Sequence, residues 1–163
     1  MAAIDTFYDL PESTAMLLNL KTYPGMTVLE SEIVRAWLKL HHTEFDSVGF
    51  NIRMGTGQLL PIGTDPAIQK MAIDLTQKRA DIVALKGADV TIVEVKIRLA
   101  LQSLGQLLGY STIWKAEHPV VGNVRLVAIA RDAVLDAPDV LMAFGVTVET
   151  FGSASVIQPG PQV

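Results

Sequence analysis

The chain has 163 residues, 50% hydrophobic and 18% charged, with 17 acidic and 13 basic residues, a composition that excludes an intrinsically disordered protein. Cysteine is absent, which excludes a disulfide framework and a zinc–thiolate site. No apolar run is long enough to span a bilayer, and the N-terminus lacks the pattern of a secretory signal, so we expect a cytoplasmic protein without a membrane partner.

The first part of the chain combines irregular patterning with one strong helix. Residues 1–25 show no clear period, apart from a short helix expected after Pro11. From Thr27 to Leu40, apolar residues recur at helical spacing, which predicts an amphipathic helix. Helical geometry places Glu30 inside the apolar stripe and Glu32 outside it. A carboxylate on the buried side of a helix needs a partner, because burying an unpaired charge is costly.

Three strands and a second strong helix are expected in the middle of the chain. Strand patterns cover Val48–Arg53, Ala80–Leu85 and Val90–Arg98, and the last two strands are close enough to form a hairpin. The long segment before the hairpin predicts a short helix from about Pro66 to Gln77, because structureless loops of that length are uncommon. A helix with a stripe of leucines follows from about Ala100 to Lys115.

The last part of the chain completes an α/β pattern. We expect a strand over Val124–Ala130, a helix over Asp132–Phe144 and a strand over Val146–Phe151, followed by a flexible, uncharged tail over about 152–163. The order of elements is helix, three strands, helix, strand, helix and strand. It predicts a single domain over residues 1–163, with its core at about 26–131 and a mixed sheet flanked by helices.

The third predicted strand carries charged side chains on one face. Because side chains alternate along a strand, Glu94, Lys96 and Arg98 point the same way, and hairpin pairing can bring Asp81 next to Glu94. Two adjacent carboxylates repel each other unless a cation lies between them. Oxygen ligands in a partly open site suit Mg²⁺, which activates phosphodiesters and water. A lysine beside that water can orient it or take its proton, and Glu30 is the natural third carboxylate.

The pair has a simpler interpretation as well. Glu94 and Lys96 alone are compatible with a solvated ion pair on an ordinary strand, because an acid followed two places later by lysine arises by chance in a chain of this size. The whole combination is more specific. It requires a strand aspartate, a turn, a strand Glu-x-Lys, a helix glutamate upstream and a helix glutamine downstream, all in this order.

Two segments of this hairpin resemble the core of the PD-(D/E)xK nuclease superfamily, as found in archaeal Holliday-junction resolvases and RecB-type nuclease domains. They are Ala80-Asp81-Ile82-Val83 and Ile92-Val93-Glu94-Val95-Lys96. Upstream, Glu30-Ser31-Glu32-Ile33-Val34 resembles the first-helix motif of the superfamily, with Glu30 in the place of the site glutamate. The residue before Asp81 is Ala80 and not proline, which many members of the superfamily also lack.

Downstream, Gln106-Leu107-Leu108-Gly109-Tyr110 resembles the Gln-x-x-x-Tyr motif of RecB-like members, with Gln102 one turn earlier as the alternative glutamine. The resemblance implies a restriction-endonuclease-like fold with an αβββαβ core. It also implies a Mg²⁺-dependent deoxyribonuclease, expected to be an endonuclease, in which Mn²⁺ can replace Mg²⁺.

The resemblance assigns a role to each candidate residue. Asp81, Glu94, the backbone carbonyl of Val95 and Glu30 would bind the metal. Lys96 would position or activate the attacking water, and Gln106 would complete the pocket. Contacts to DNA are expected from five further side chains, namely Arg53, Lys78, Arg79, Arg98 and Tyr110.

The acidic total does not exclude a DNA substrate. Residues 26–131 carry 12 basic and 10 acidic residues, whereas residues 132–163 carry four acidic and no basic ones. The central module is therefore locally basic, and we expect weak, salt-sensitive DNA binding. DNA is the expected partner, with a homodimer or docking onto a larger DNA-processing assembly as further possibilities. The alternative function is a non-catalytic subunit of a repair, restriction or phage DNA-packaging assembly, which for a phage protein would act in the host cell or virion.

Overall fold

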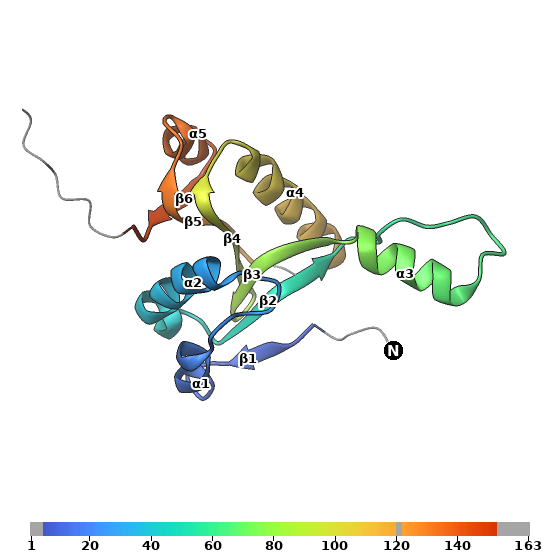
Figure 1. The fold of residues 1–163 in the computed structure, drawn as a ribbon, viewed down its shortest axis with the longest axis horizontal. Helices are drawn as coiled ribbons and strands as arrows, with labels where there is room; N and C mark the ends of the chain where they lie inside the picture. The colour runs from blue at the N-terminus through green and yellow to red at the C-terminus, as the bar shows by residue number, and fades with distance from the viewer. Residues whose placement is uncertain (1–4, 120–121, 153–163) are drawn as a thin grey trace, which may run out of the picture.

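The computed structural model describes residues 5–119 and 122–152, so that part of the predicted tail, residues 153–163, lies outside it. One six-stranded sheet lies between helices on its two faces (Figure 1). The strands are β1 (Phe7–Asp9), β2 (Ser47–Met54), β3 (Lys78–Lys86), β4 (Asp89–Leu99), β5 (Val124–Ala133) and β6 (Val146–Thr150). The helices are α1 (Thr14–Asn19), α2 (Val28–His41), α3 (Pro66–Thr76), α4 (Gln102–Glu117) and α5 (Ala137–Ala143), with a 3₁₀ turn at His42–Glu44.

The strands are ordered β1-β2-β3-β4-β5-β6 across the sheet. The first four strands pair antiparallel, and β5 and β6 are added in parallel through the crossover helices α4 and α5. The segment from α2 to β5 therefore has the αβββαβ order, which confirms the predicted mixed sheet flanked by helices. Within the described ranges, no helix is both long and apolar enough to cross a membrane.

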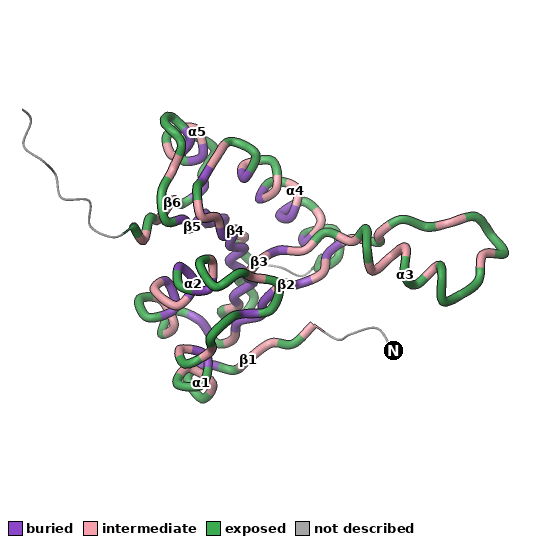
Figure 2. The backbone as a smooth tube through the Cα atoms, viewed as in Figure 1, coloured by how far each residue is buried: buried purple, intermediate pink, exposed green. Residues whose placement is uncertain are grey.

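The core has two layers, one on each face of the sheet. On one face, α2 places Ile33, Trp37 and Leu38 against a cluster that includes Val93 and Val95 of β4. On the other face, side chains of α4 pack against β4 and β5, namely Leu107, Tyr110 and Trp114 against Ile92 and Ala128. Figure 2 shows the buried residues concentrated in the sheet between these helices. Because β4 is covered on both faces, most of its residues are buried, as is usual for strands in parallel pairs.

The predicted helix over Asp132–Phe144 is wrong in its first part. β5 continues through Asp132 and Ala133, which pair with Arg98 and Leu99 of β4. A left-handed residue, Asp136 with φ of 68°, then separates the strand from α5. Five residues of predicted helix, 132–136, are thus strand and turn, because pairing with β4 extends β5 beyond the point where its own sequence predicts a strand.

The irregular structure predicted for residues 1–25 is also partly wrong. β1 pairs antiparallel with β2, with Phe7 opposite Gly49, and forms one edge of the sheet. A strand of three residues shows no alternation that a sequence pattern could detect. The short helix expected after Pro11 is confirmed as α1, which begins at Thr14.

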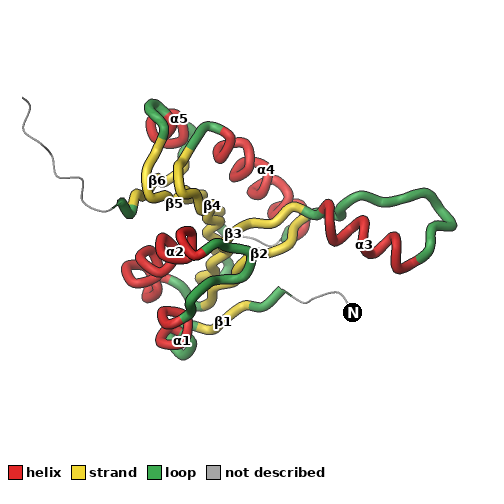
Figure 3. The backbone as a smooth tube through the Cα atoms, viewed as in Figure 1, coloured by secondary structure: helices red, strands yellow, loops and turns green. Residues whose placement is uncertain are grey.

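Residues 55–77, which we call the arm, project away from the sheet as a long loop followed by α3 (Figures 1 and 3). The helix predicted from about Pro66 to Gln77 is confirmed as α3. Asp65 caps it, because its Oδ1 accepts a hydrogen bond from the Ala67 amide at 2.8 Å, and Pro66 stands at its first turn. No residue of α3 is buried.

Candidate active site

The β3–β4 hairpin brings three of the predicted residues together. Its register pairs Ile82 with Val93, and one further step places Asp81 opposite Glu94. Oδ2 of Asp81 accepts a hydrogen bond from the backbone N–H of Val95 at 2.8 Å. The ammonium group of Lys96 donates to Oε1 of Glu94. The two carboxylates and the lysine therefore form one cluster at the point where β3 and β4 begin to diverge.

Glu94 is buried, with only 1% of its surface exposed. One oxygen contacts Lys96, whereas Oε2 is buried and has no hydrogen-bond partner within the part of the chain that the structure describes. Burial, together with the charges of Asp81 and Glu30, raises the pKa of Glu94 to about 7 against the opposing effect of Lys96. A buried carboxylate oxygen without a partner is costly, and such a group points to a missing ion or a functional role.

Asp81 experiences the same competition. Burial raises its pKa, while the Val95 N–H bond and the charge of Lys96 lower it and the charge of Glu30 raises it again. Among the described residues, no group of three or more His, Cys, Asp or Glu side chains is arranged to hold a metal ion alone.

Glu30 contributes to the cluster from the first turn of α2. Its charge raises the pKa values of both Asp81 and Glu94, which places it within electrostatic reach of the two carboxylates. Glu30 also forms a capping box with Thr27, whose backbone N–H and hydroxyl both donate to Oε2 of Glu30 at 2.8 Å. Glu32 is exposed, as the helical pattern predicted. Glu30 thus caps α2 through Thr27, and its charge also acts on the two carboxylates.

Gln106 and Tyr110 approach the cluster from α4, on the face of the sheet opposite to α2. Nε2 of Gln106 donates to the hydroxyl of Tyr110 at 3.4 Å. Burial raises the pKa of Tyr110 to about 12, and the charges of Glu94 and Asp81 raise it as well, so the tyrosine lies near both carboxylates. Both side chains line a cavity of about 430 Å³ together with Lys78 and the alternative glutamine, Gln102.

The remaining candidates for DNA contact occupy different surroundings. Arg53 and Arg79 are opposite each other on β2 and β3 and line a second cavity of about 210 Å³. The Arg79 guanidinium also donates to the backbone oxygen of Asp74 at 3.2 Å. Arg98 lies at the end of β4, where it contacts Asp132 at 3.8 Å and both side chains are exposed. Arg53 and Arg79 therefore line a cavity, whereas Arg98 lies on the exposed surface beside Asp132.

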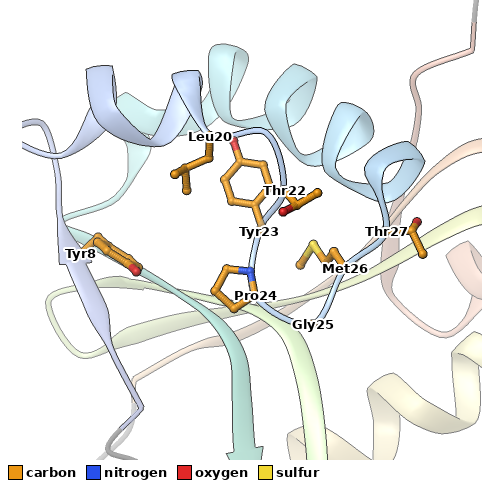
Figure 4. Close-up of a pocket in the computed structure, with 8 residues that line it drawn as sticks. All are labelled: Tyr8, Leu20, Thr22, Tyr23, Pro24, Gly25, Met26 and Thr27. Atoms are coloured by element: carbon orange, nitrogen blue, oxygen red, sulfur yellow. The ribbon is translucent and has the colours of Figure 1, made fainter.

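A groove of about 700 Å³ lies beside the N-terminus of α2 (Figure 4). It is lined on one side by Tyr8 of β1 and on the other by the turn that leads into α2, including Tyr23, Pro24 and Thr27. Tyr8 and Pro24 also line the cavity that holds Arg53 and Arg79. The groove and the cavity with the two arginines therefore adjoin each other at Tyr8 and Pro24. The groove could not be predicted from the sequence because β1 was not.

Asn51 is a further residue that the sequence patterns did not indicate. It interrupts β2 with a φ of 55°, a conformation that asparagine tolerates better than most residues, and its place in the strand register is opposite Asp81. Its side chain packs against Gly25 so closely that a Cβ on Gly25 would lie 2.7 Å from its Cγ. The Pro24-Gly25 turn is therefore held in place against the strand next to the cluster.

Replacing Gly25 with alanine is expected to lower the free energy of unfolding by about 2 kcal/mol, because Gly25 has a φ of 76° and the new methyl group would collide with Asn51. Gly145→Ala is the matched control, since Gly145 has a φ of 79° but no atom within 4 Å of the added Cβ. Urea unfolding of both variants checks the result. Equal losses would show that the contact with Asn51 contributes nothing.

No family model and no curated protein matches the sequence. Among solved structures, the chain is similar to a protein of unknown function at 11% identity, over 75% of this chain and 57% of that one, with a TM-score of 0.46. It is also similar to a repair endonuclease from Pyrococcus abyssi at 17% identity, over 82% of this chain and 50% of that one, with a TM-score of 0.45. The chain thus spans only a little over half of the one and half of the other. At this level of similarity, neither structure bears on the chemistry of the site.

Proposed function

We propose that this protein is a metal-dependent deoxyribonuclease that hydrolyses phosphodiester bonds as an endonuclease at the Asp81–Glu94–Lys96 cluster. The observation that supports this function best is the buried Oε2 of Glu94, which has no hydrogen-bond partner among the described residues and lies beside a second, half-buried carboxylate, Asp81. Lys96 supplies one positive charge against two carboxylates, with Glu30 adding a third negative charge nearby. A divalent cation would remove the remaining repulsion.

The donor set fits Mg²⁺, with Mn²⁺ as a substitute. Asp81 and Glu94 would hold the ion, with the Val95 carbonyl as a further oxygen donor, and Glu30 would hold a metal-bound water or help to bind a second ion. Bound Mg²⁺ would supply Lewis-acid activation of the phosphodiester. The chain itself keeps the two carboxylates in register through the hairpin and fixes Asp81 through the Val95 N–H bond.

The other residues of the cluster would orient water and substrate. The ammonium group of Lys96 would hold the attacking water by donating a hydrogen bond to it, and would stabilise charge that develops on the phosphate. Tyr110, whose raised pKa keeps its hydroxyl protonated, would donate a hydrogen bond near the carboxylates, with Gln106 holding it in place. Phosphates on either side of the scissile bond would reach Lys78 in one cavity and Arg53 and Arg79 in the other.

The proposal is tested by incubating the protein with supercoiled, linear, single-stranded and branched DNA in Mg²⁺, Mn²⁺ or EDTA. We expect cleavage with either metal and none with EDTA. Asp81→Asn is expected to reduce cleavage by ~100-fold or more, because it removes a metal-binding charge. Asp139→Asn, on the exposed surface of α5, is the matched control and should cleave like the wild type. Cleavage that persists in EDTA or in Asp81→Asn would contradict the site.

A non-catalytic subunit that keeps the nuclease fold is the second candidate. The large apolar side chains exposed on the arm favour an interaction role, since soluble proteins seldom expose such patches without use. Binding of DNA without cleavage of any of the four substrates, in either metal, would support this candidate over the nuclease.

A further inference from the structure

His41, the last residue of α2, contacts a carboxylate at each nitrogen of its imidazole ring. Nδ1 lies 2.5 Å from Oε1 of Glu44 in the 3₁₀ turn, and Nε2 lies 2.9 Å from Oε2 of Glu149 in β6. An ionised carboxylate can only accept hydrogen bonds, and a neutral imidazole has a single N–H to donate. The neutral ring would therefore turn a lone pair toward one of the two carboxylates. Only the imidazolium form, with two N–H groups, satisfies both contacts.

The surroundings of His41 favour this charged form. The imidazole ring packs against the buried indole of Trp37, with the ring centres 5.4 Å apart, and 22% of the His41 side chain is exposed. Burial by itself lowers the pKa of His41. The hydrogen bonds with Glu44 and Glu149, together with the charges of the two carboxylates, outweigh that effect and raise the pKa above 6.5.

The two carboxylates differ in what else holds them. The guanidinium of Arg125, on β5, donates to Oε2 of Glu44 at 3.3 Å, so Glu44 keeps a cation whatever the charge of His41. Within the described ranges, His41 is the only side chain that bonds to the carboxylate of Glu149. The neighbouring His42 bonds to a backbone oxygen of its own helix instead, at 3.0 Å. When His41 loses one proton, the longer contact with Glu149 is therefore the one that is lost.

Glu149 lies near the end of the outermost strand of the sheet (Figure 1). β6 pairs only with β5, where Glu149 is opposite Ile129. Val146 and Val148 of β6 pack into the core cluster on the α4 face, whereas Glu149 reaches α2 on the opposite face. The charge state of His41 therefore decides whether the end of β6 is bonded to α2.

We propose that His41 is a protonation-dependent clasp, which bonds the end of β6 to α2 when the imidazole is charged and releases it when the imidazole is neutral. The contact is complete below pH 6.5 and is lost as the pH rises through the higher pKa that His41 has in the folded protein. Release is local, because the pairing of β2, β3 and β4 does not involve this contact. It loosens β6 and makes the outer edge of β5 accessible to another strand.

Hydrogen exchange of backbone amides tests the release, measured by NMR on the full chain from about pH 5.5 to about pH 9 and corrected for the pH dependence of exchange itself. The imidazole signals of His41 are followed in the same samples. Amides of β2 report the stability of the whole protein. We expect the protection of β6 to fall roughly 10-fold more than that of β2 as His41 titrates, because a charge-assisted hydrogen bond is lost.

Two substitutions of Glu149 separate the clasp from a merely structural contact. Glu149→Gln keeps the shape of the side chain, and its amide can accept from an imidazole N–H or donate to a bare nitrogen. The protection of β6 relative to β2 should then no longer depend on pH. Glu149→Ala removes the contact and should give low protection of β6 at every pH. His42→Gln is the matched control and should behave like the wild type.

Three results would overturn the proposal. In the first, His41 titrates while the protection of β6 stays constant relative to β2. In the second, the His41 ring stays charged up to about pH 9, so that the clasp never opens. In the third, the pH dependence of β6 persists in Glu149→Gln, which would assign the release to another group.

Discussion

Glu94→Gln is expected to be more stable than the wild type at pH 8, by about 3 kcal/mol in the free energy of unfolding, while cleavage falls by ~1,000-fold. The carboxyl group of Glu94 is buried, and its pKa is raised from 4.5 to about 7. Ionisation of Glu94 therefore lowers the free energy of unfolding at pH 8. Glutamine has nearly the same shape and stays neutral at every pH, so it avoids this cost.

The direction of the pH dependence follows from proton binding. Between pH 4.5 and about 7, folded Glu94 holds its proton more firmly than it does in the unfolded chain. Its contribution to stability is full below pH 4.5, decreases as the pH rises and is lost above about 7. The pKa of His41 is also raised, because its hydrogen bonds with Glu44 and Glu149 outweigh the opposing effect of burial. His41 therefore also loses its contribution to stability as the pH rises, but it does so equally in the variant and the wild type. The difference between the variant and the wild type therefore isolates Glu94.

Guanidinium unfolding at pH 5 and pH 8 in EDTA measures the effect, with Glu32→Gln on the exposed side of α2 as the matched control. The advantage of Glu94→Gln should appear at pH 8 and be small at pH 5. Mg²⁺ at pH 8 should stabilise the wild type and not the variant. An equal change in stability between the two pH values for both proteins would show that Glu94 titrates normally, whatever the outcome of the cleavage assay.

Lys96→Met is expected to have the opposite effect on stability and the same effect on cleavage. The methionine keeps most of the volume of the lysine stem but removes the positive charge that contacts the carboxylate of Glu94. The pKa of Glu94 should then rise above about 7. We expect a loss of roughly 1–2 kcal/mol at pH 8, because Glu94 then takes up a proton and protonation one pH unit above a pKa of about 7 limits the cost.

The same variant is expected to cleave DNA ~1,000-fold more slowly, since it loses the group that orients water and stabilises the phosphate. Lys86→Met removes the partner of Asp46 in an exposed ion pair of 2.7 Å and serves as the control, with no measurable effect expected on either property. If Lys96→Met were as stable as the wild type at pH 8 and equally active, Lys96 would be only a solvated surface charge.

The cluster could be predicted from the sequence because its parts are determined locally. Asp81 and Glu94 belong to one hairpin whose two-residue turn at Gly87-Ala88 leaves little freedom in the register. Glu30 was placed correctly relative to Glu32 because helical periodicity alone separates the two faces of α2. These inferences needed no knowledge of which elements pack together.

What the sequence patterns missed depends on packing between distant elements. The near-complete burial of Glu94 results from β5, whose small Ala128 lies beside it, and from Tyr110 on α4. The unusual backbone of Asn51 is supported by Gly25. Gly25 lies in the turn before α2 and belongs to neither of the strands that carry the carboxylates. The sequence predicted α3 as a helix, but it did not show which side chains of α3 are exposed. That depends on the loop of the arm, which covers one face of the helix. Roles for these residues remain predictions.

The order of the strands has a consequence for how the protein is made. Each strand pairs with the one that precedes it in the chain, from β1 to β6. During synthesis, the sheet can therefore grow by one strand at a time as the chain leaves the ribosome, without waiting for a distant segment. The hairpin that carries Asp81 and Glu94 is complete before α4 and β5 are made. Its carboxylates then meet while still in water, and the energetic cost of their proximity is imposed only when the later elements cover them.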